Sequence, residues 1–223
     1  MTQSTTALDA TKPAKGGRAP AGTDPRKRRQ ILEGASRVFS NLGFDAASMS
    51  DVAREAAVSK ATLYVYFQDK EHLFSAICAE KRDRNIAELI TLLDRNKPLE
   101  ETLMTFGVDL VQRISQPHVV AANRIVIGVA ERMPEIGQDF FQGGAMRLAK
   151  AVADFIVFHA ERGELRVSDA HHAASQFLEL SLVGIFRPRL YGVITEPASD
   201  EEGQIVVKSA VRVFLAAYGA KQG

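Results

Sequence analysis

Four side chains that can bind nucleic acid lie close together in one short segment of the chain. They are Lys60, Thr62, Tyr64 and Tyr66, and they follow Ser59, a good N-terminal helix cap. Lysine and tyrosine can bind phosphates, threonine can hydrogen-bond to base edges, and the N-terminus of a helix itself favours phosphate. The segment therefore predicts a short helix that reads the major groove of DNA.

The preceding residues predict a second helix and a tight turn that position this reading helix. Ser48 and Asp51 have the approximate spacing of a capping box, and small apolar residues follow at 52, 53 and 56. Ala57 and Val58 must then form the turn, with Val58 directed inward. The result is a helix–turn–helix pattern, although three ordinary core helices would be compatible with a pattern of this generic kind.

The order of residues here resembles the tetracycline-repressor-type (TetR) family of bacterial regulators. The resemblance covers residues 28–74, and its most specific parts are residues 43–44, 58–67 and 70–74. It implies an all-α protein that forms a homodimer. Each subunit would have a small N-terminal DNA-binding domain and a larger C-terminal domain that binds an effector and the second subunit.

The resemblance also implies which residues contact DNA. Ser48 and Lys70 would hold phosphates at the starts of two helices, Tyr64 and Tyr66 would reach the phosphate backbone, and residues 60–62 would face base edges. The predicted DNA-binding residues are Ser48, Ser59, Lys60, Ala61, Thr62, Tyr64, Tyr66 and Lys70.

Two residues depart from the family pattern. Ala57 stands at a turn position that the family often fills with glycine, which costs about 1 kcal/mol if its φ angle is positive. Val65 stands where the family often has a polar or aromatic residue. It either contacts a thymine methyl group or makes no contact with DNA.

Charge is distributed unevenly along the 223 residues, although the net charge is only +1. Residues 1–30 contain seven Lys or Arg and two Asp, a net charge of +5, so the rest of the chain is acidic. A basic leading end on an acidic body suits DNA at one end of the molecule and another partner elsewhere.

Cysteine content and hydropathy favour a cytoplasmic protein without a membrane span. Cys78 is the single cysteine, so no disulfide can form within the chain, and we expect it to be a small buried hydrophobic residue rather than a redox group. No signal peptide is evident in residues 1–24, and no run of 18 uncharged apolar residues occurs.

The positions of helix-capping residues, glycines and prolines predict an all-α fold of about nine helices, in a chain that divides into three regions. Residues 1–23 are expected to be a disordered basic arm that either tracks DNA or is an inert tail, residues 24–72 a helix–turn–helix DNA-binding domain, and residues 73–223 an effector-binding and dimerisation domain. The expected helices cover residues 25–42, 48–56, 59–67, 69–93, 97–115, 117–132, 134–163, 168–192 and 199–218.

Three of these helices have features that bear on function. The helix over 69–93 has a charged middle between apolar ends, which suits a connection between two bodies across solvent, or simply an exposed face. Gly143-Gly144 predicts a kink or break in the helix over 134–163. Pro188 predicts a bend or an early end in the helix over 168–192.

Apolar residues of the C-terminal region, with a few polar ones among them, predict a pocket for a small apolar or amphipathic effector. For any single Phe or Met, however, a plain core position is the simpler interpretation. The candidate pocket residues are Met104, Phe106, Leu110, Asn123, Arg124, Ile127, Phe141, Phe155 and His159.

The last two expected helices are apolar around most of their circumference, so each must be buried on more than one side. A four-helix dimer interface accounts for this, and the family resemblance implies the same surface. The candidate interface residues are Phe177, Leu178, Ser181, Gly184, Ile185, Val206, Ala210, Val213 and Phe214.

No catalytic, metal or cofactor site is expected. The sequence has no nucleophile elbow, P-loop or dinucleotide-binding fingerprint, and His171-His172 are adjacent, so they point in different directions on a helix. We therefore expect a transcriptional regulator, most simply a repressor, that binds a palindromic double-stranded DNA operator as a homodimer. The alternatives are a small-molecule sensor or carrier with a non-functional DNA head, and a non-specific DNA-coating protein.

Overall fold

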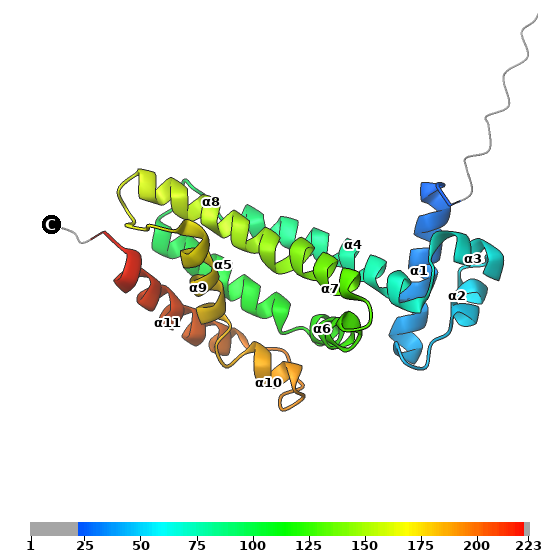
Figure 1. Cartoon of the computed structure of the whole chain (residues 1–223). Coiled ribbons are helices and arrows are strands. Elements are labelled where there is room, and N and C mark those ends of the chain that lie inside the picture. The colour runs from blue at the N-terminus through cyan, green and yellow to red at the C-terminus, as the bar shows by residue number, and fades with distance from the viewer. Residues whose placement is uncertain (1–21, 221–223) are drawn as a thin grey trace, which may run out of the picture. The chain divides into compact units, whose positions relative to one another are not determined.

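The computed structural model describes residues 22–220, which form the helices α1 to α11 and one π-helical segment, η1 (Figure 1). Within these residues the only β-type pairing is an isolated bridge between Leu165 and Gly219, so the all-α prediction is confirmed. The chain divides into two compact units, and the boundary along the chain lies between Asp69 and Lys70. The predicted basic arm lies outside the described residues except for residues 22 and 23.

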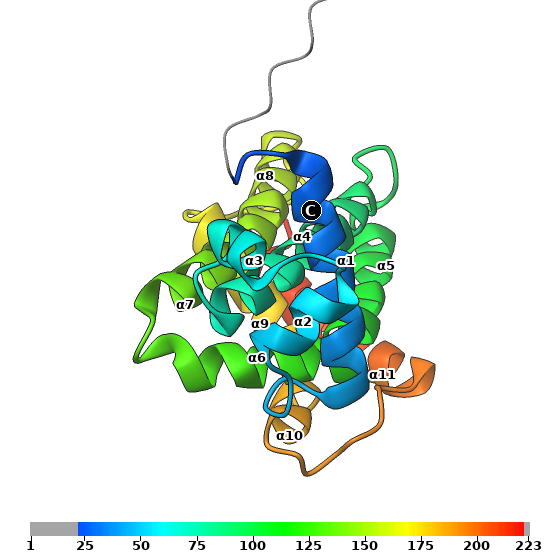
Figure 2. The same ribbon diagram turned by 90° about the vertical axis from the view of Figure 1, so that its right-hand side faces the viewer.

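The N-terminal unit contains α1 (Pro25–Leu42), α2 (Met49–Glu55) and α3 (Lys60–Tyr66), which Figure 2 shows as one small group of helices. Helix α1 begins where the Asp24 carboxylate accepts hydrogen bonds from two backbone N–H groups. At Gly34, α1 and α2 touch, since a Cβ atom there would lie 2.7 Å from the Cβ atom of Ala56. Glycine thus allows two helices to approach more closely than any other residue would.

The C-terminal unit is a bundle whose helices enclose one main hydrophobic cluster. Its largest fully buried side chains come from α5, α8, α9 and α11, namely Phe106, Phe155, Phe177 and Phe214. The elements of this unit are α4 (Lys70–Thr91), α5 (Leu99–Ile114), α6 (Pro117–Ala130), α7 (Pro134–Phe141), η1 (Gln142–Met146), α8 (Arg147–Glu161), α9 (Ala170–Ser181), α10 (Phe186–Leu190) and α11 (Asp200–Tyr218).

The α-helix expected over residues 134–163 is interrupted at Gly143-Gly144, where a kink or break is predicted, but the helix does not end there. The chain stays helical from α7 through η1 into α8, and the two glycines lie inside the π-helical turn. Arg82 of α4 explains why this turn has glycines, because a Cβ atom at Gly143 would lie 2.3 Å from its Nη2 atom. The glycine pair makes room for a side chain from another helix rather than ending its own.

The helix expected over residues 168–192 is divided in two, and the division comes before Pro188, where a bend or an early end is predicted. The chain forms α9 and α10 instead, and between them Gly184 has φ +74°, a left-handed conformation that glycine adopts without strain. Pro188 lies within the short α10. This split and the π-helical turn explain why the described residues contain more helical elements than expected.

Candidate nucleic-acid interface

Each helix of the helix–turn–helix begins at a side-chain cap. The Ser48 hydroxyl accepts a hydrogen bond from the backbone N–H of Asp51, whose carboxylate accepts one from the backbone N–H of Ser48, so the predicted capping box is confirmed. Hydrogen bonds from the Ser48 hydroxyl and from Arg54 hold the pKa of Asp51 below its usual value. The Ser59 hydroxyl caps α3 in the same way, by accepting from the N–H of Thr62 at 3.0 Å.

The turn between α2 and α3 requires an uncommon backbone conformation. Ala57 has a φ angle of +50°, which lies in the left-handed region. This is the conformation that glycine, the residue the family often has at this position, adopts without strain. Val58 is half-buried beside it, and its N–H donates to the carbonyl of Ala53 at 3.0 Å. The turn is thus closed by main-chain hydrogen bonding despite the strain at one residue.

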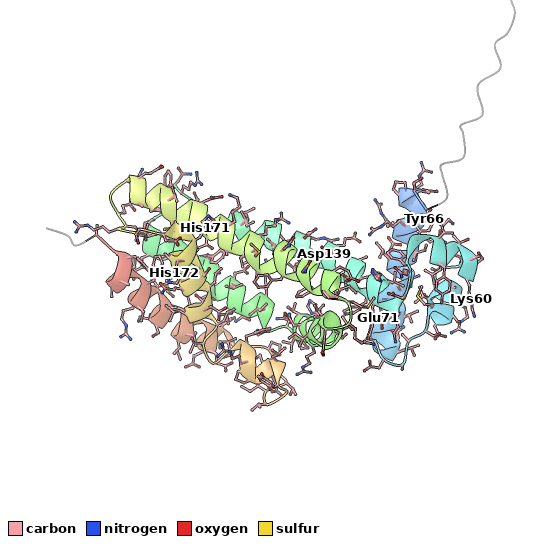
Figure 3. The ribbon with its side chains drawn as sticks, in the orientation of Figure 1. Lys60, Tyr66, Glu71, Asp139, His171 and His172 are labelled. Carbon is pink, nitrogen blue, oxygen red and sulfur yellow. The ribbon has the colours of Figure 1, made fainter. Side chains whose placement is uncertain are left out.

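Helix α3 has a buried face and an outward face. Leu63 is 0% exposed and Phe67 is 6% exposed, which confirms that these two residues anchor the helix. The opposite side is open to solvent at Lys60, Ala61 and Tyr64. Lys60 forms no ion pair within residues 22–220, and Figure 3 shows it at the end of α3 away from Tyr66.

The remaining predicted contact residues of α3 are placed differently. The Thr62 hydroxyl lies 2.8 Å from the Ser59 hydroxyl, so these two groups are hydrogen-bonded to each other rather than directed freely outward. Tyr66 is half-buried, as is Lys70 at the start of α4. Val65 is 52% exposed and therefore accessible to a base or to solvent.

The candidate pocket residues fall into two groups. Phe106, Leu110 and Phe155 lie in the main hydrophobic cluster, Met104 packs against it, and the His159 ring lies 4.4 Å from that of Phe155. The other group lies outside this cluster. Asn123 and Arg124 donate to backbone carbonyls, and Ile127 and Phe141 are exposed.

His159 is the most unusual polar group of the first set. It is 2% exposed, its Nδ1 atom lies 2.8 Å from a carboxylate oxygen of Glu164, and its Nε2 atom has no hydrogen-bond partner within the described residues. Hydrogen bonds from Arg162 and then from His159 hold the pKa of Glu164 below its usual value. An unsatisfied buried nitrogen is costly, so a polar group of a ligand could stabilise it.

The candidate interface residues also divide, by burial. Five of them are already enclosed within the subunit, so they are core residues here and have no surface to offer a second chain; they are Phe177, Ser181, Ile185, Ala210 and Phe214. The other four reach the surface at least in part, and they are Leu178, Gly184, Val206 and Val213.

Two arginines with structural roles were not anticipated from the sequence. Arg82 donates to the carbonyls of Asp139 and Phe140 and lies over the Phe140 ring. Arg189 is 2% exposed and donates to the carbonyls of Ile185 and Glu196. The two adjacent glycines are the sequence feature that indicates a close neighbour at η1. No feature of the sequence distinguishes Arg189 from a surface residue.

The described residues offer no group of three His, Cys, Asp or Glu side chains that could hold a metal ion. Among residues 22–220, no helix combines the length and apolar character that crossing a membrane requires. Burial raises the pKa of the Cys78 thiol to about 11.

Comparison with protein families matches both units. Residues 31–77 match the model described as bacterial regulatory proteins, tetR family, and residues 101–220 match the C-terminal domain of AefR-like transcriptional repressors. The second match alone covers more than half of the chain.

Individual proteins and solved structures of transcriptional regulators are also similar to this chain. The HTH-type transcriptional repressor Rv1474c of Mycobacterium tuberculosis is 36% identical over 61 residues, which are 27% of this chain and only 33% of that protein. A crystal structure of a TetR-family regulator from Mesorhizobium loti has a TM-score of 0.78 and 28% identity, covering 87% of this chain and 97% of that one. The flavonoid-responsive regulator FrrA has a TM-score of 0.68 and 26% identity, covering 89% and 100%.

Proposed function

The chain belongs to the tetR family of bacterial regulatory proteins, and we propose that it is a repressor that binds a palindromic DNA operator as a homodimer and releases it when a small effector binds. The observation that carries the proposal is the outward face of α3. Lys60, Ala61 and Tyr64 are open to solvent on a helix that Leu63 and Phe67 anchor from behind. Such a face can enter the major groove without rearrangement of the unit.

Dimerisation supplies the second reading helix that a palindrome requires. Exposed Val213 and the half-buried Leu178 and Val206, on α9 and α11, support an interface on these helices. The DNA partner further supports a cytoplasmic location.

The proposed effector is a small apolar or amphipathic molecule bound among the aromatic residues of the C-terminal unit. Phe106 and Phe155 supply apolar surface, and the unsatisfied Nε2 atom of His159 supplies one polar point. The name of FrrA, a similar protein described as flavonoid-responsive, is consistent with an aromatic effector that carries hydrogen-bonding groups.

Release requires that the effector bind the DNA-incompetent arrangement more tightly than the competent one. A coupling free energy of roughly 1–3 kcal/mol is typical and gives up to about a hundredfold derepression. A complete switch from 1:99 to 99:1 would need about 5.5 kcal/mol.

Footprinting on the DNA that flanks the protein's own gene tests the proposal. We expect protection confined to one palindrome, and we expect Lys60→Ala and Tyr64→Ala each to weaken binding by about 1–3 kcal/mol without unfolding the protein. Tyr191→Ala is the matched control, because this tyrosine is 80% exposed but lies in the other unit.

Two other outcomes would each support a different function. A chain that binds small molecules but protects no DNA would be a sensor or carrier. Equal affinity for the palindrome and for random duplex, with a steep loss in salt, would indicate non-specific coating of DNA.

A further inference from the structure

Four consecutive cationic residues, Arg26, Lys27, Arg28 and Arg29, follow Pro25 at the start of α1, and we call this segment the cationic turn. This turn contains no acidic residue. Cations at a helix N-terminus oppose the helix dipole, so the arrangement does not help α1 to form. The backbone N–H groups of Arg26 and Lys27 already donate to Asp24, so any ligand-binding capacity here resides in the side chains.

These four side chains also lack carboxylate partners within residues 22–220. Arg26, Arg28 and Arg29 are exposed, and the Lys27 ammonium donates to the side-chain oxygen of Gln30. The described residues of the same unit contain two arginines of a different kind. Arg37 pairs with Glu55 and Arg54 pairs with Asp51, each at 2.6 Å.

Two contacts place this turn beside the C-terminal half of α3. The guanidinium carbon of Arg28 lies 5.5 Å from the ring centroid of Phe67, the residue that ends α3. Just before α1, a Cβ atom at Gly22 would lie 3.2 Å from the carbonyl oxygen of Val65. The cationic turn is therefore at the Tyr66 end of α3, whereas Lys60 is at the other end (Figure 3).

We propose that Arg26, Arg28 and Arg29 form a second binding site for the phosphate backbone of the operator, at the opposite end of α3 from Lys60. A guanidinium group can donate two parallel hydrogen bonds to a phosphate, which a lysine cannot match. Helix α3 is only about 10 Å long, so cations at both ends fix its position along the groove. The site adds affinity and register but reads no bases.

The inference rests on the proposed DNA-binding function and is tested on the full-length protein with the operator duplex. Arg26→Gln and Arg29→Gln, alone and combined, leave the contact between Arg28 and Phe67 in place. We expect each substitution to flatten the plot of log affinity against log salt by about 0.9 units per subunit and to weaken random duplex equally.

Arg37→Gln is the matched control, since it removes the same charge from the same helix but from an arginine that already has a carboxylate partner. It should leave the salt slope unchanged. Thermal unfolding of each variant establishes that the fold is kept.

The possible outcomes separate the two hypotheses. If the wild-type protein protects no palindrome, the proposed function fails. If it protects one and the combined variant keeps the wild-type salt slope, only the second site is refuted. A slope that falls equally in the Arg37→Gln control would also refute it, because the effect would then be one of general charge.

Discussion

Ala57 is the residue at which sequence and backbone conformation conflict most clearly. Among the described residues it is the only non-glycine with a positive φ angle, at +50°, and it lies in the turn that sets α3 against α2. A Cβ atom in this region is unfavourable by roughly 1–2 kcal/mol, because it crowds the following carbonyl oxygen.

Ala57→Gly should therefore stabilise the N-terminal unit by about 0.5–1 kcal/mol. This value is the strain relieved in the folded state minus the entropy that glycine adds to the unfolded chain. Hydrogen exchange of the α2 and α3 amides measures this locally. Ser36→Gly, in the interior of α1, is the control and should destabilise the unit by about 0.5 kcal/mol, because glycine is a poor helix former. Faster exchange in the Ala57→Gly protein would show that this turn is not strained.

At the scale of elements, the charged middle of the long helix is mostly an exposed face, since Lys81, Asp83 and Arg84 are exposed, and its Arg82 contacts the π-helical turn. Arg82 is half-buried against α7 and η1, and its neighbour Asp83 lies 3.6 Å from Arg147 of α8. Figure 1 shows α4 running alongside α7 and α8. Helix α4 is thus held by specific polar contacts at its charged middle.

A double-mutant cycle between Arg82→Met and Gly143→Ala tests this contact. Gly143→Ala alone should destabilise the protein, because the new Cβ atom would displace Arg82 from the carbonyls of Asp139 and Phe140. In the Arg82→Met background the same change should be neutral or stabilising, because alanine favours a helix more than glycine does. We expect a coupling energy of about 1–2 kcal/mol in urea unfolding.

Gly128→Ala serves as the control for this cycle, because a Cβ atom at Gly128 would meet no other atom within 4 Å. Its effect should be the same in both backgrounds. Additive effects of the first pair would mean that Arg82 does not depend on the glycine.

At the scale of the whole molecule, assembly decides whether two reading helices can act together. Val213 is 45% exposed on α11 and belongs to the predicted interface. Val213→Glu should yield a monomer at concentrations at which the wild-type protein is a dimer, because a charge would be buried without a partner. Sedimentation measures the mass of the assembly. The affinity for the palindrome should fall as dimerisation is lost.

Ile127→Glu provides the comparison, since Ile127 is 61% exposed on α6 and lies outside the predicted interface. It should leave the mass unchanged. A Val213→Glu protein that remains dimeric would place the interface on another surface.

The sequence by itself determined the local features of this protein. Two helix starts could be predicted from the capping residues Ser48, Asp51 and Ser59. The buried side of α3 could be predicted from the spacing of Leu63 and Phe67. Caps and helical periodicity depend on residues within about one turn of each other, so one sequence contains all the information they need.

Only the tertiary structure decided what depends on distant neighbours. Gly143 leaves room for Arg82, some sixty positions earlier in the chain, whose side chain occupies the space where a Cβ atom would lie. Phe177 and Phe214, expected at a subunit interface, pack within their own subunit. Apolar character shows that a residue must be buried, but it does not say against which partner, because hydrophobic burial has no direction.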